Sequence, residues 1–317
     1  MNKKRRLPRG AEYLTARGHV RRICIERDLG VNSQQPSELQ VVRALNNNVV
    51  LAKERPAGRE MILVGKGLGY HFPKGSRLTL DDVRIEKVSF IVDGSRREQY
   101  QQLLEIIDER VIGVTEEIIE LASHQLGCPL SDHIHVALAD HIGFALERAR
   151  KGLEIPNPML TEIRSLYVQE YRLAKEAADL VERRLGTRLP ESDVGFLALH
   201  FYAARSRRSP KEASRHVGLI REIIGFVEDR YEVALAEGSL DYERFLVHLK
   251  GFLEALEAGK RVENPLLDRI QASFPEAFSV AGELAVLVKA RTGWEAQPEQ
   301  IGYLALHLQR IKNTSVA

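Results

Sequence analysis

Four of the ten histidines stand at matching positions of a long internal repeat, and we call them the repeat histidines. The number of residues from His141 to His200 equals the number from His248 to His307. A single histidine beside apolar residues is usually a satisfied core group, but a core rarely requires imidazole twice in each copy of a repeat. Two uses are chemically sensible, namely metal ligation and reversible phosphorylation of a ring nitrogen, since neutral imidazole is both a ligand and a nucleophile.

Metal ligation would need a third and a fourth ligand near the histidines. The first copy offers them in Asp140 beside His141, with His133 and His135 earlier in the same segment. The second copy has a valine, a leucine and a tyrosine at the corresponding positions. A metal site common to both copies is therefore disfavoured, and we expect neither a metal nor a cofactor. A metal-dependent hydrolase built on the four residues of the first copy stays an alternative, and it predicts stoichiometric bound metal.

The segments that carry these histidines repeat with a constant offset. The sequence VGFLALHF at 194–201 matches IGYLALHL at 301–308, and Asn-Pro motifs at 157–158 and 264–265 share the same offset. A period of this length is too long for a solenoid unit and fits a whole small domain. Both copies are rich in Ala, Leu, Glu and Arg with apolar residues at helical spacing, so we expect two all-α helical bundles at 99–206 and 207–317.

The front of the chain has a different pattern and a different set of polar residues. Short runs rich in Val, Ile and Leu at 39–64 are separated by Asn and Gly clusters, which is typical of a small antiparallel sheet. Asn46 and Asn48 present a donor and an acceptor suited to a base edge. Lys66 and Tyr70 add a cation and an aromatic ring, the combination that holds RNA on sheet surfaces. So small a module buries little core, and we expect it to dimerise.

Two simpler interpretations of this module stay open. The glycines Gly65, Gly67 and Gly69 could cradle a phosphate, but a nucleotide loop needs a helix N-terminus behind it, and the segment that follows shows no helix start. We expect the glycines instead to let two backbone segments approach closely. The Asn cluster could also be a tight turn without a ligand, and the charges a solvated face.

The charge of the chain is unevenly distributed. The 46 Lys+Arg and 44 Asp+Glu leave a formal charge of +2, yet residues 1–38 carry +5 (nine basic, four acidic) and residues 39–80 another +5 (seven basic, two acidic). The rest of the chain therefore carries −8 (2 − 10). A basic front end on an acidic body indicates that the front contacts a polyanion. We expect residues 1–38 to be a basic leader that is either disordered or the product of a mis-assigned start.

Cysteine usage and hydropathy indicate the compartment. The two cysteines, Cys24 and Cys128, lie far apart in the chain and provide no disulfide framework, which is typical of a reducing compartment. The basic start lacks the apolar segment of a signal peptide, and no run approaches the length of a membrane span. We therefore expect a cytoplasmic protein without membrane insertion.

Together these motifs resemble the transcriptional antiterminators of the BglG/SacY/LicT type. Residues 39–50 (LQVVRALNNNVV) are similar to the start of their co-antiterminator RNA-binding domain, 65–70 (GKGLGY) to its second RNA-contacting segment and 84–88 (RIEKV) to its exit. The duplicated body resembles their two PTS regulation domains, each with two phosphorylatable histidines. The resemblance implies a multidomain α+β protein, in which a small antiparallel β-sheet RNA-binding domain at 39–92 is followed by two all-α helical bundle domains.

The family implies a homodimer that binds a hairpin in nascent mRNA, whose formation excludes an overlapping terminator hairpin upstream of sugar-utilisation genes. The implied RNA contacts are Arg43, Asn46, Asn48, Gly65, Lys66, Gly67 and Tyr70. In the first regulatory domain a sugar-specific PTS permease would phosphorylate His141 and His200 and switch the protein off, with Asp140 orienting the His141 ring. In the second, the PTS phosphocarrier HPr would phosphorylate His248 and His307 and favour the active dimer.

The resemblance implies a regulator and not an enzyme. A phosphoryl group adds up to two negative charges between helical domains, which is enough to favour one arrangement over another. The alternative is a DNA-binding activator built on the same regulatory domains. It needs a helix-turn-helix ahead of them, and the Asn- and Gly-punctuated runs at 39–72 argue against one. The inducing sugar is read by the permease and is not encoded in this chain.

Overall fold

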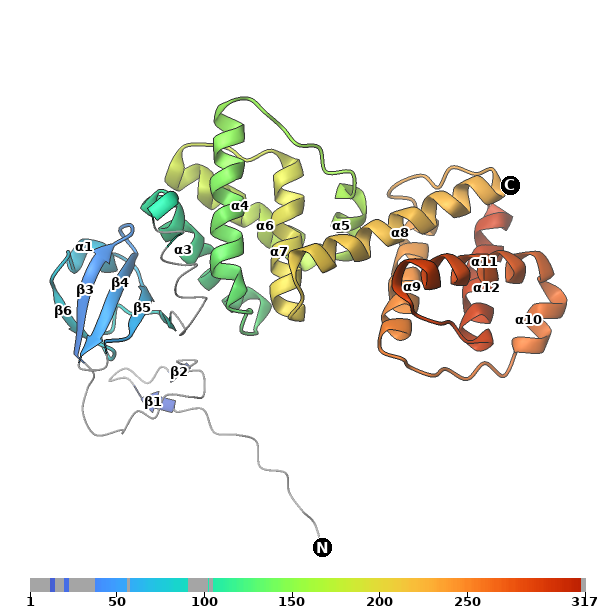
Figure 1. The fold of residues 1–317 in the computed structure, drawn as a ribbon, viewed down its shortest axis with the longest axis horizontal. Coiled ribbons are helices and arrows are strands. Elements are labelled where there is room, and N and C mark those ends of the chain that lie inside the picture. Colours follow the sequence, from blue (N-terminus) through green and yellow to red (C-terminus); the bar gives the residue numbers. More distant parts are fainter. Residues whose placement is uncertain are drawn as a thin grey trace, which may run out of the picture. The chain divides into compact units, whose positions relative to one another are not determined.

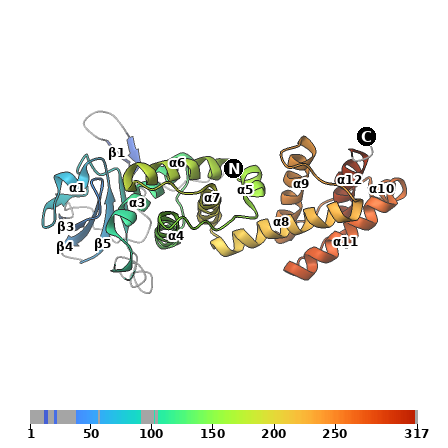
Figure 2. The same ribbon diagram turned by 90° about the horizontal axis from the view of Figure 1, so that it is seen from above.

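The structure is a computed structural model that describes residues 12–14, 20–22, 38–55, 58–90, 102 and 105–314. The chain divides into two compact units (Figures 1 and 2). The first comprises residues 1–154 and 175–190, and the second comprises 155–174 and 191–317. Of the expected basic leader, only the antiparallel pair β1 (Glu12–Leu14) and β2 (Val20–Arg22) is described, and its other residues before 38 lie outside the described part.

The first unit contains a five-stranded antiparallel sheet. Its strands are β3 (Glu38–Ala44), β4 (Val49–Arg55), β5 (Glu60–Val64), β6 (Arg77–Thr79) and β7 (Lys87–Phe90), in the spatial order β6-β3-β4-β5-β7. The one-turn helix α1 (Leu68–His71) follows β5. The sheet predicted from the Val- and Ile-rich runs is therefore confirmed, and its antiparallel pairs join β3 to β4 and β4 to β5.

Both faces of this sheet are apolar, and different parts of the chain cover them. Successive side chains of a strand point to opposite faces, so Val50 and Leu51 enter different cores. Val50 packs in a core closed by α1 and by residues around β6. Leu51 packs in a second core with Ile112 and Ala139. These two residues belong to α3 (Glu109–Leu126) and α4 (His133–Arg150), and Figure 1 shows α3 beside the sheet.

The repeat inferred from the sequence appears as matching helices. The same constant offset relates the starts of α4 and α9 (Leu240–Glu257), of α5 (Leu160–Leu166) and α10 (Leu267–Ser273), of α6 (Val168–Leu185) and α11 (Pro275–Thr292), and of α7 (Glu191–Ser206) and α12 (Pro298–Thr314). The first helices of the two copies are α3 and α8 (Pro210–Tyr231). Every regular element described in the two copies is a helix, so the multidomain α+β class with two all-α bundles is confirmed.

The repeated Asn-Pro and Gly motifs have a structural role. Asn157 and Asn264 each donate from the side chain to a backbone carbonyl 35 residues later, at 3.3 and 3.2 Å. Each also accepts a backbone N–H two residues on, at 3.1 Å. A Cβ on Gly195 or Gly302 would lie 2.6 or 2.8 Å from the amide nitrogen of its asparagine. The asparagine therefore ties the segment ahead of α5 or α10 to the start of α7 or α12, and the glycine leaves it room.

The compact units do not follow the copies of the repeat. Helix α6 has its first residues in the second unit and continues into the first, so the first copy is shared between the units. His141 belongs to the first unit, and the other repeat histidines belong to the second. The domain boundaries 39–92, 99–206 and 207–317 stay predictions. Among the described residues, no helix is long and apolar enough to span a bilayer.

Candidate nucleic-acid interface and histidine sites

The two polar clusters of the front module meet at one end of the sheet. The Asn46-Asn47-Asn48 turn joins β3 to β4, and the Gly-rich segment 65–70 follows β5. The side-chain oxygen of Asn48 accepts the Gly67 N–H at 2.9 Å. The carbonyl of Asn47 accepts the Gly69 N–H at 3.0 Å. Two segments that are well separated in the sequence thus form one surface, as a shared ligand would require.

The glycines make this close approach possible. A Cβ on Gly65 would lie 1.7 Å from the carbonyl oxygen of Arg84, and one on Gly69 would lie 2.0 Å from that of Asn46. Gly67 has a φ of +69°, which disfavours other residues. The expected backbone approach is confirmed. No helix begins in the segment that follows Tyr70, as expected. Helix α1 begins inside the glycine segment, after the Gly67 turn, and its four residues are too short to serve as a phosphate-binding helix.

Lys66 and Tyr70 project from this surface into solvent. The Tyr70 side chain is 79% exposed, with its ring in an edge contact with His71 at a centroid distance of 5.6 Å. Lys66 is also exposed. Burial of an aromatic ring is the usual way in which it stabilises a fold, so a ring this exposed is available for stacking on a base.

Asn46 and Asn48 direct their amide nitrogens toward α3. The Asn46 oxygen accepts the backbone N–H groups of Asn48 at 2.7 Å and Val49 at 2.9 Å, which fixes the side-chain orientation. The amide nitrogens of Asn46 and Asn48 then donate to the two carboxylate oxygens of Glu117, at 2.8 and 3.0 Å. The predicted RNA-contacting asparagines therefore already have a partner within the chain.

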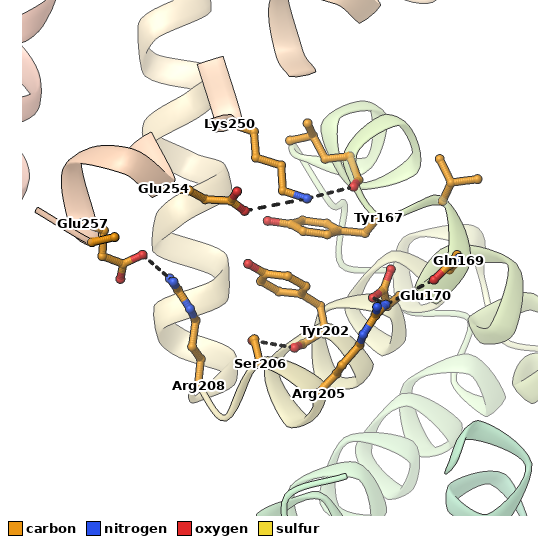
Figure 3. A pocket seen from close by; sticks show the side chains of 13 residues that line it. Tyr167, Gln169, Glu170, Tyr202, Arg205, Ser206, Arg208, Lys250, Glu254 and Glu257 are labelled. Atoms are coloured by element: carbon orange, nitrogen blue, oxygen red, sulfur yellow. Dashed lines mark hydrogen bonds and ion pairs between the residues drawn. The ribbon is translucent and has the colours of Figure 1, made fainter. Parts of the chain in front are cut away.

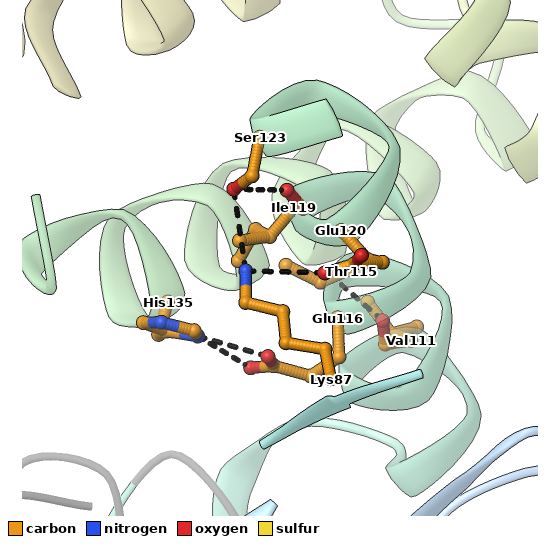
Figure 4. A network of polar contacts seen from close by, with 8 residues as sticks. All are labelled: Lys87, Val111, Thr115, Glu116, Ile119, Glu120, Ser123 and His135. Carbon is orange, nitrogen blue, oxygen red and sulfur yellow. Dashed lines mark hydrogen bonds and ion pairs between the residues drawn. The ribbon is translucent and has the colours of Figure 1, made fainter. Parts of the chain in front are cut away.

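Two further contacts join α3 to basic residues of the front module. Arg43, another predicted RNA contact, forms an ion pair of 2.8 Å with Glu109. Lys87 on β7 lies 3.2 Å from the Ser123 hydroxyl and 3.4 Å from Glu120 (Figure 4). These acidic partners of the basic module were not among the residues predicted from the sequence. Their signal was present in the chain, because Glu109, Glu117 and Glu120 recur at spacings that place them on one side of a helix.

The metal alternative finds no support in the described residues. His135, one of its four proposed ligands, places Nδ1 at 2.8 and 2.9 Å from the carboxylate of buried Glu116 (Figure 4). Asp140 is exposed on α4. Within the part of the chain that the structure describes, no three His, Cys, Asp or Glu side chains come together in an arrangement that could hold a metal ion.

The histidines of the second copy form a stacked pair. The rings of His248 on α9 and His307 on α12 have centroids 3.7 Å apart and planes inclined by 20°. Burial, followed by repulsion from His248 and Arg310, lowers the pKa of His307 to about 4. His307 is therefore neutral at pH 7, the state in which a ring nitrogen is a nucleophile. His248 is exposed, so the pair can be reached from solvent.

The histidines of the first copy lie in different units. His141 is partly buried on α4 in the first unit, next in sequence to exposed Asp140. His200 is partly buried on α7 in the second unit. Their roles, and that of Asp140, stay predictions.

The second unit contains a cavity of about 770 Å³ (Figure 3). Its charged lining groups pair with one another, Arg205 with Glu170 at 2.9 Å and Arg208 with Glu257. The Lys250 ammonium group lies over the ring of Tyr167. None of the repeat histidines lines the cavity, and its charges are already matched, so we assign it no part in the site.

An antiparallel sheet that presents Asn, Lys and Tyr at one end, followed by a duplicated helical domain with histidines at repeated positions, is the arrangement of a nucleic-acid-binding regulator. The CAT RNA binding domain matches residues 39–98, and the PRD domain matches 116–204 and 221–311. With these matches and the relatives below, the chain belongs to the family of LicT/BglG-type transcription antiterminators. It is thus an RNA-binding regulator of transcription that carries PTS regulation domains.

The relatives span most of the chain. It is 33% identical over 276 residues to the transcription antiterminator LicT of Bacillus subtilis (strain 168), which covers 86% of this chain and 99% of the relative. It is 30% identical to the beta-glucoside operon antiterminator of Dickeya chrysanthemi, with 87% and 97% covered. A crystal structure of GlcT CAT-PRDI is 34% identical, with a TM-score of 0.45, and covers 53% of this chain and 99% of its own. The names of the two antiterminators describe regulators.

The alternative of a DNA-binding activator loses its basis. It required a helix-turn-helix ahead of the regulatory domains, and the described residues between 38 and 90 form the sheet with only the one-turn helix α1.

Proposed function

We propose that this protein acts in the cytoplasm on a hairpin in nascent mRNA. Stabilising the hairpin excludes an overlapping terminator upstream of sugar-utilisation genes, so transcription continues. The observation that carries the proposal is the single surface made by the Asn turn and the Gly-rich segment, from which Lys66 and Tyr70 project. Lysine neutralises phosphate, an exposed ring stacks on a splayed base, and amides read base edges, which together suit a hairpin loop.

The regulatory part of the proposal assigns the repeat histidines to phosphorylation. HPr would phosphorylate His248 and His307, and a sugar-specific PTS permease would phosphorylate His141 and His200. The stacking of exposed His248 on His307, whose ring burial keeps neutral, supports the first assignment. A phosphoryl group brings a charge of nearly −2 that favours one assembly of the acidic body over another, and we propose that the RNA-binding assembly is a homodimer.

The RNA assignment is tested by measuring the Kd of the full chain for a terminator-overlapping hairpin at fixed salt. Tyr70→Ala should weaken binding by roughly tenfold or more, because one stacked base is worth about 1–3 kcal/mol. Lys66→Ala should weaken it and reduce the salt dependence. Lys74→Ala is the matched control, since Lys74 is also an exposed lysine of the same module and lies outside the segments that form the surface. Equal affinities for Tyr70→Ala and the wild type would show that RNA does not use this surface.

A further inference from the structure

The helix α3 occupies the donors that RNA would need. The side-chain oxygens of Asn46 and Asn48 accept backbone N–H groups, and their amide nitrogens donate to Glu117 at 2.8 and 3.0 Å. The Glu117 side chain is only 12% exposed. A carboxylate is an acceptor like a phosphate oxygen or a base carbonyl, so it satisfies these amides in the way that RNA would.

Other carboxylates of α3 extend the same contact. Glu109, two turns before Glu117, pairs with Arg43 at 2.8 Å. Glu120 lies 3.4 Å from Lys87 on β7. One acidic side of the helix therefore faces a series of cationic and donating groups on the sheet domain, although the front module is basic as a whole and suited to a polyanion.

Close packing holds α3 in this place. Ile112 is fully buried in the core that contains Val49, Leu51 and Ile62 of the sheet. Gly113 lies against the Asn46 side chain, where a Cβ would come within 2.5 Å of the amide nitrogen. A larger residue at this position would push the helix away from the asparagine, so the contact is shaped for close approach.

We infer that α3 is an intramolecular competitor of RNA, and that this arrangement is a closed form in which Glu117 masks Asn46 and Asn48. The inference rests on the proposed function, because it takes these asparagines as RNA contacts. Lys66 and Tyr70 remain exposed in the closed form, so RNA can make a first encounter. Full binding requires Glu117 to move away from the asparagines. The apparent affinity for RNA is therefore the intrinsic affinity multiplied by the fraction of molecules in the open form.

The test compares the Kd of full-length variants for the same hairpin RNA at one salt concentration. Glu117→Ala should bind about tenfold more tightly, because it removes two hydrogen bonds from a charged acceptor that RNA must displace. Glu105→Ala is the charge-matched control, since Glu105 is exposed just ahead of α3. It should change the Kd by less than about twofold, because the charge of an exposed carboxylate is screened by salt. Equal affinities for these two variants would overturn the inference.

Arg184 separates masking from general loosening of the helix. It pairs with the same carboxylate at 2.9 Å, and Arg184→Ala leaves both asparagine contacts in place. This variant should bind RNA like the wild type, and a gain equal to that of Glu117→Ala would show that freeing the asparagines is not the cause. Glu117→Gln, which keeps the size of the side chain and removes its charge, replaces Glu117→Ala if that variant unfolds, and it too should bind more tightly.

The Tyr70→Ala variant separates the inference from the function on which it rests. Tyr70 is remote from α3 in its contacts, so its loss weakens RNA binding only if the surface binds RNA. Unchanged binding in Tyr70→Ala contradicts the proposed function itself. Weakened binding in Tyr70→Ala, together with no gain in Glu117→Ala, leaves the function intact and rejects the masking alone.

Discussion

At the scale of single residues, we expect the stacked His307 ring to make the free energy of unfolding depend on pH below neutrality. Its pKa is lowered to about 4 in the folded chain, whereas an unfolded chain would protonate this residue near 6.5. Below pH 6.5 the unfolded state binds a proton that the folded state refuses, so stability present above that pH is lost as the pH falls toward 4. After allowance for partial exposure, the loss should be about 1–2 kcal/mol.

The measurement is the free energy of unfolding by urea at pH 7 and at pH 5. His307→Gln keeps a polar side chain without a titrating ring, so the wild type should lose more stability than this variant over the same interval. His248→Ala removes one repelling neighbour and should shrink the wild-type loss, although burial remains. Identical pH dependence in the wild type and in His307→Gln would show that the ring is not held neutral by the fold.

At the scale of the elements, we expect the glycine that packs against the asparagine in each repeat to tolerate substitution poorly. A Cβ on Gly302 would lie 2.8 Å from the amide nitrogen of Asn264 and 3.0 Å from Leu267. Asn264 is fixed by two hydrogen bonds and cannot move aside freely. Gly302→Ala should therefore destabilise the chain by about 1–3 kcal/mol in urea unfolding.

The matched control is Gly251 on α9, where an added Cβ would meet nothing within 4 Å. Gly251→Ala should raise stability by about 0.5–1 kcal/mol, because alanine is the better helix former. If both variants change stability in the same direction, the close packing at Gly302 is not limiting.

The same elements show what the sequence could and could not predict. The constant offset of the repeat was visible in the motifs, and four pairs of helices reproduce it because duplicated sequences fold alike. The turn at Asn46 and the close approach at Gly65 followed from local backbone chemistry. The hydrogen bond from Asn46 to Glu117 joins residues 71 positions apart. The spacing of the glutamates indicates an acidic side of the helix, but it does not predict that this side packs on the sheet. The stacking of His248 on His307 is also a packing outcome.

At the scale of the whole molecule, the uneven charge acquires a structural meaning. The front module carries +5 over residues 39–80, and the body that follows is acidic. Part of that acidity lies on α3, where Glu109 and Glu117 contact the basic module directly. The opposite charges of the front module and the body were evident in the sequence. Only the fold shows that carboxylates of the body contact the front module of the same chain. A regulator of this construction balances internal carboxylates against RNA for the same donors.

Phosphorylation should act on that balance through the second copy of the repeat. Incubation with HPr, enzyme I and labelled phosphoenolpyruvate should label the wild type, and the His248→Ala/His307→Ala double variant should lose the label of its second domain, because both proposed phosphoryl acceptors of that domain are gone. His124→Ala is the control, since His124 is exposed and lies outside the repeat positions. The labelled wild type should also bind hairpin RNA more tightly than the unlabelled protein. Full labelling of the second domain in the double variant would refute the assignment of these histidines, and a label that leaves the Kd unchanged would refute its coupling to RNA.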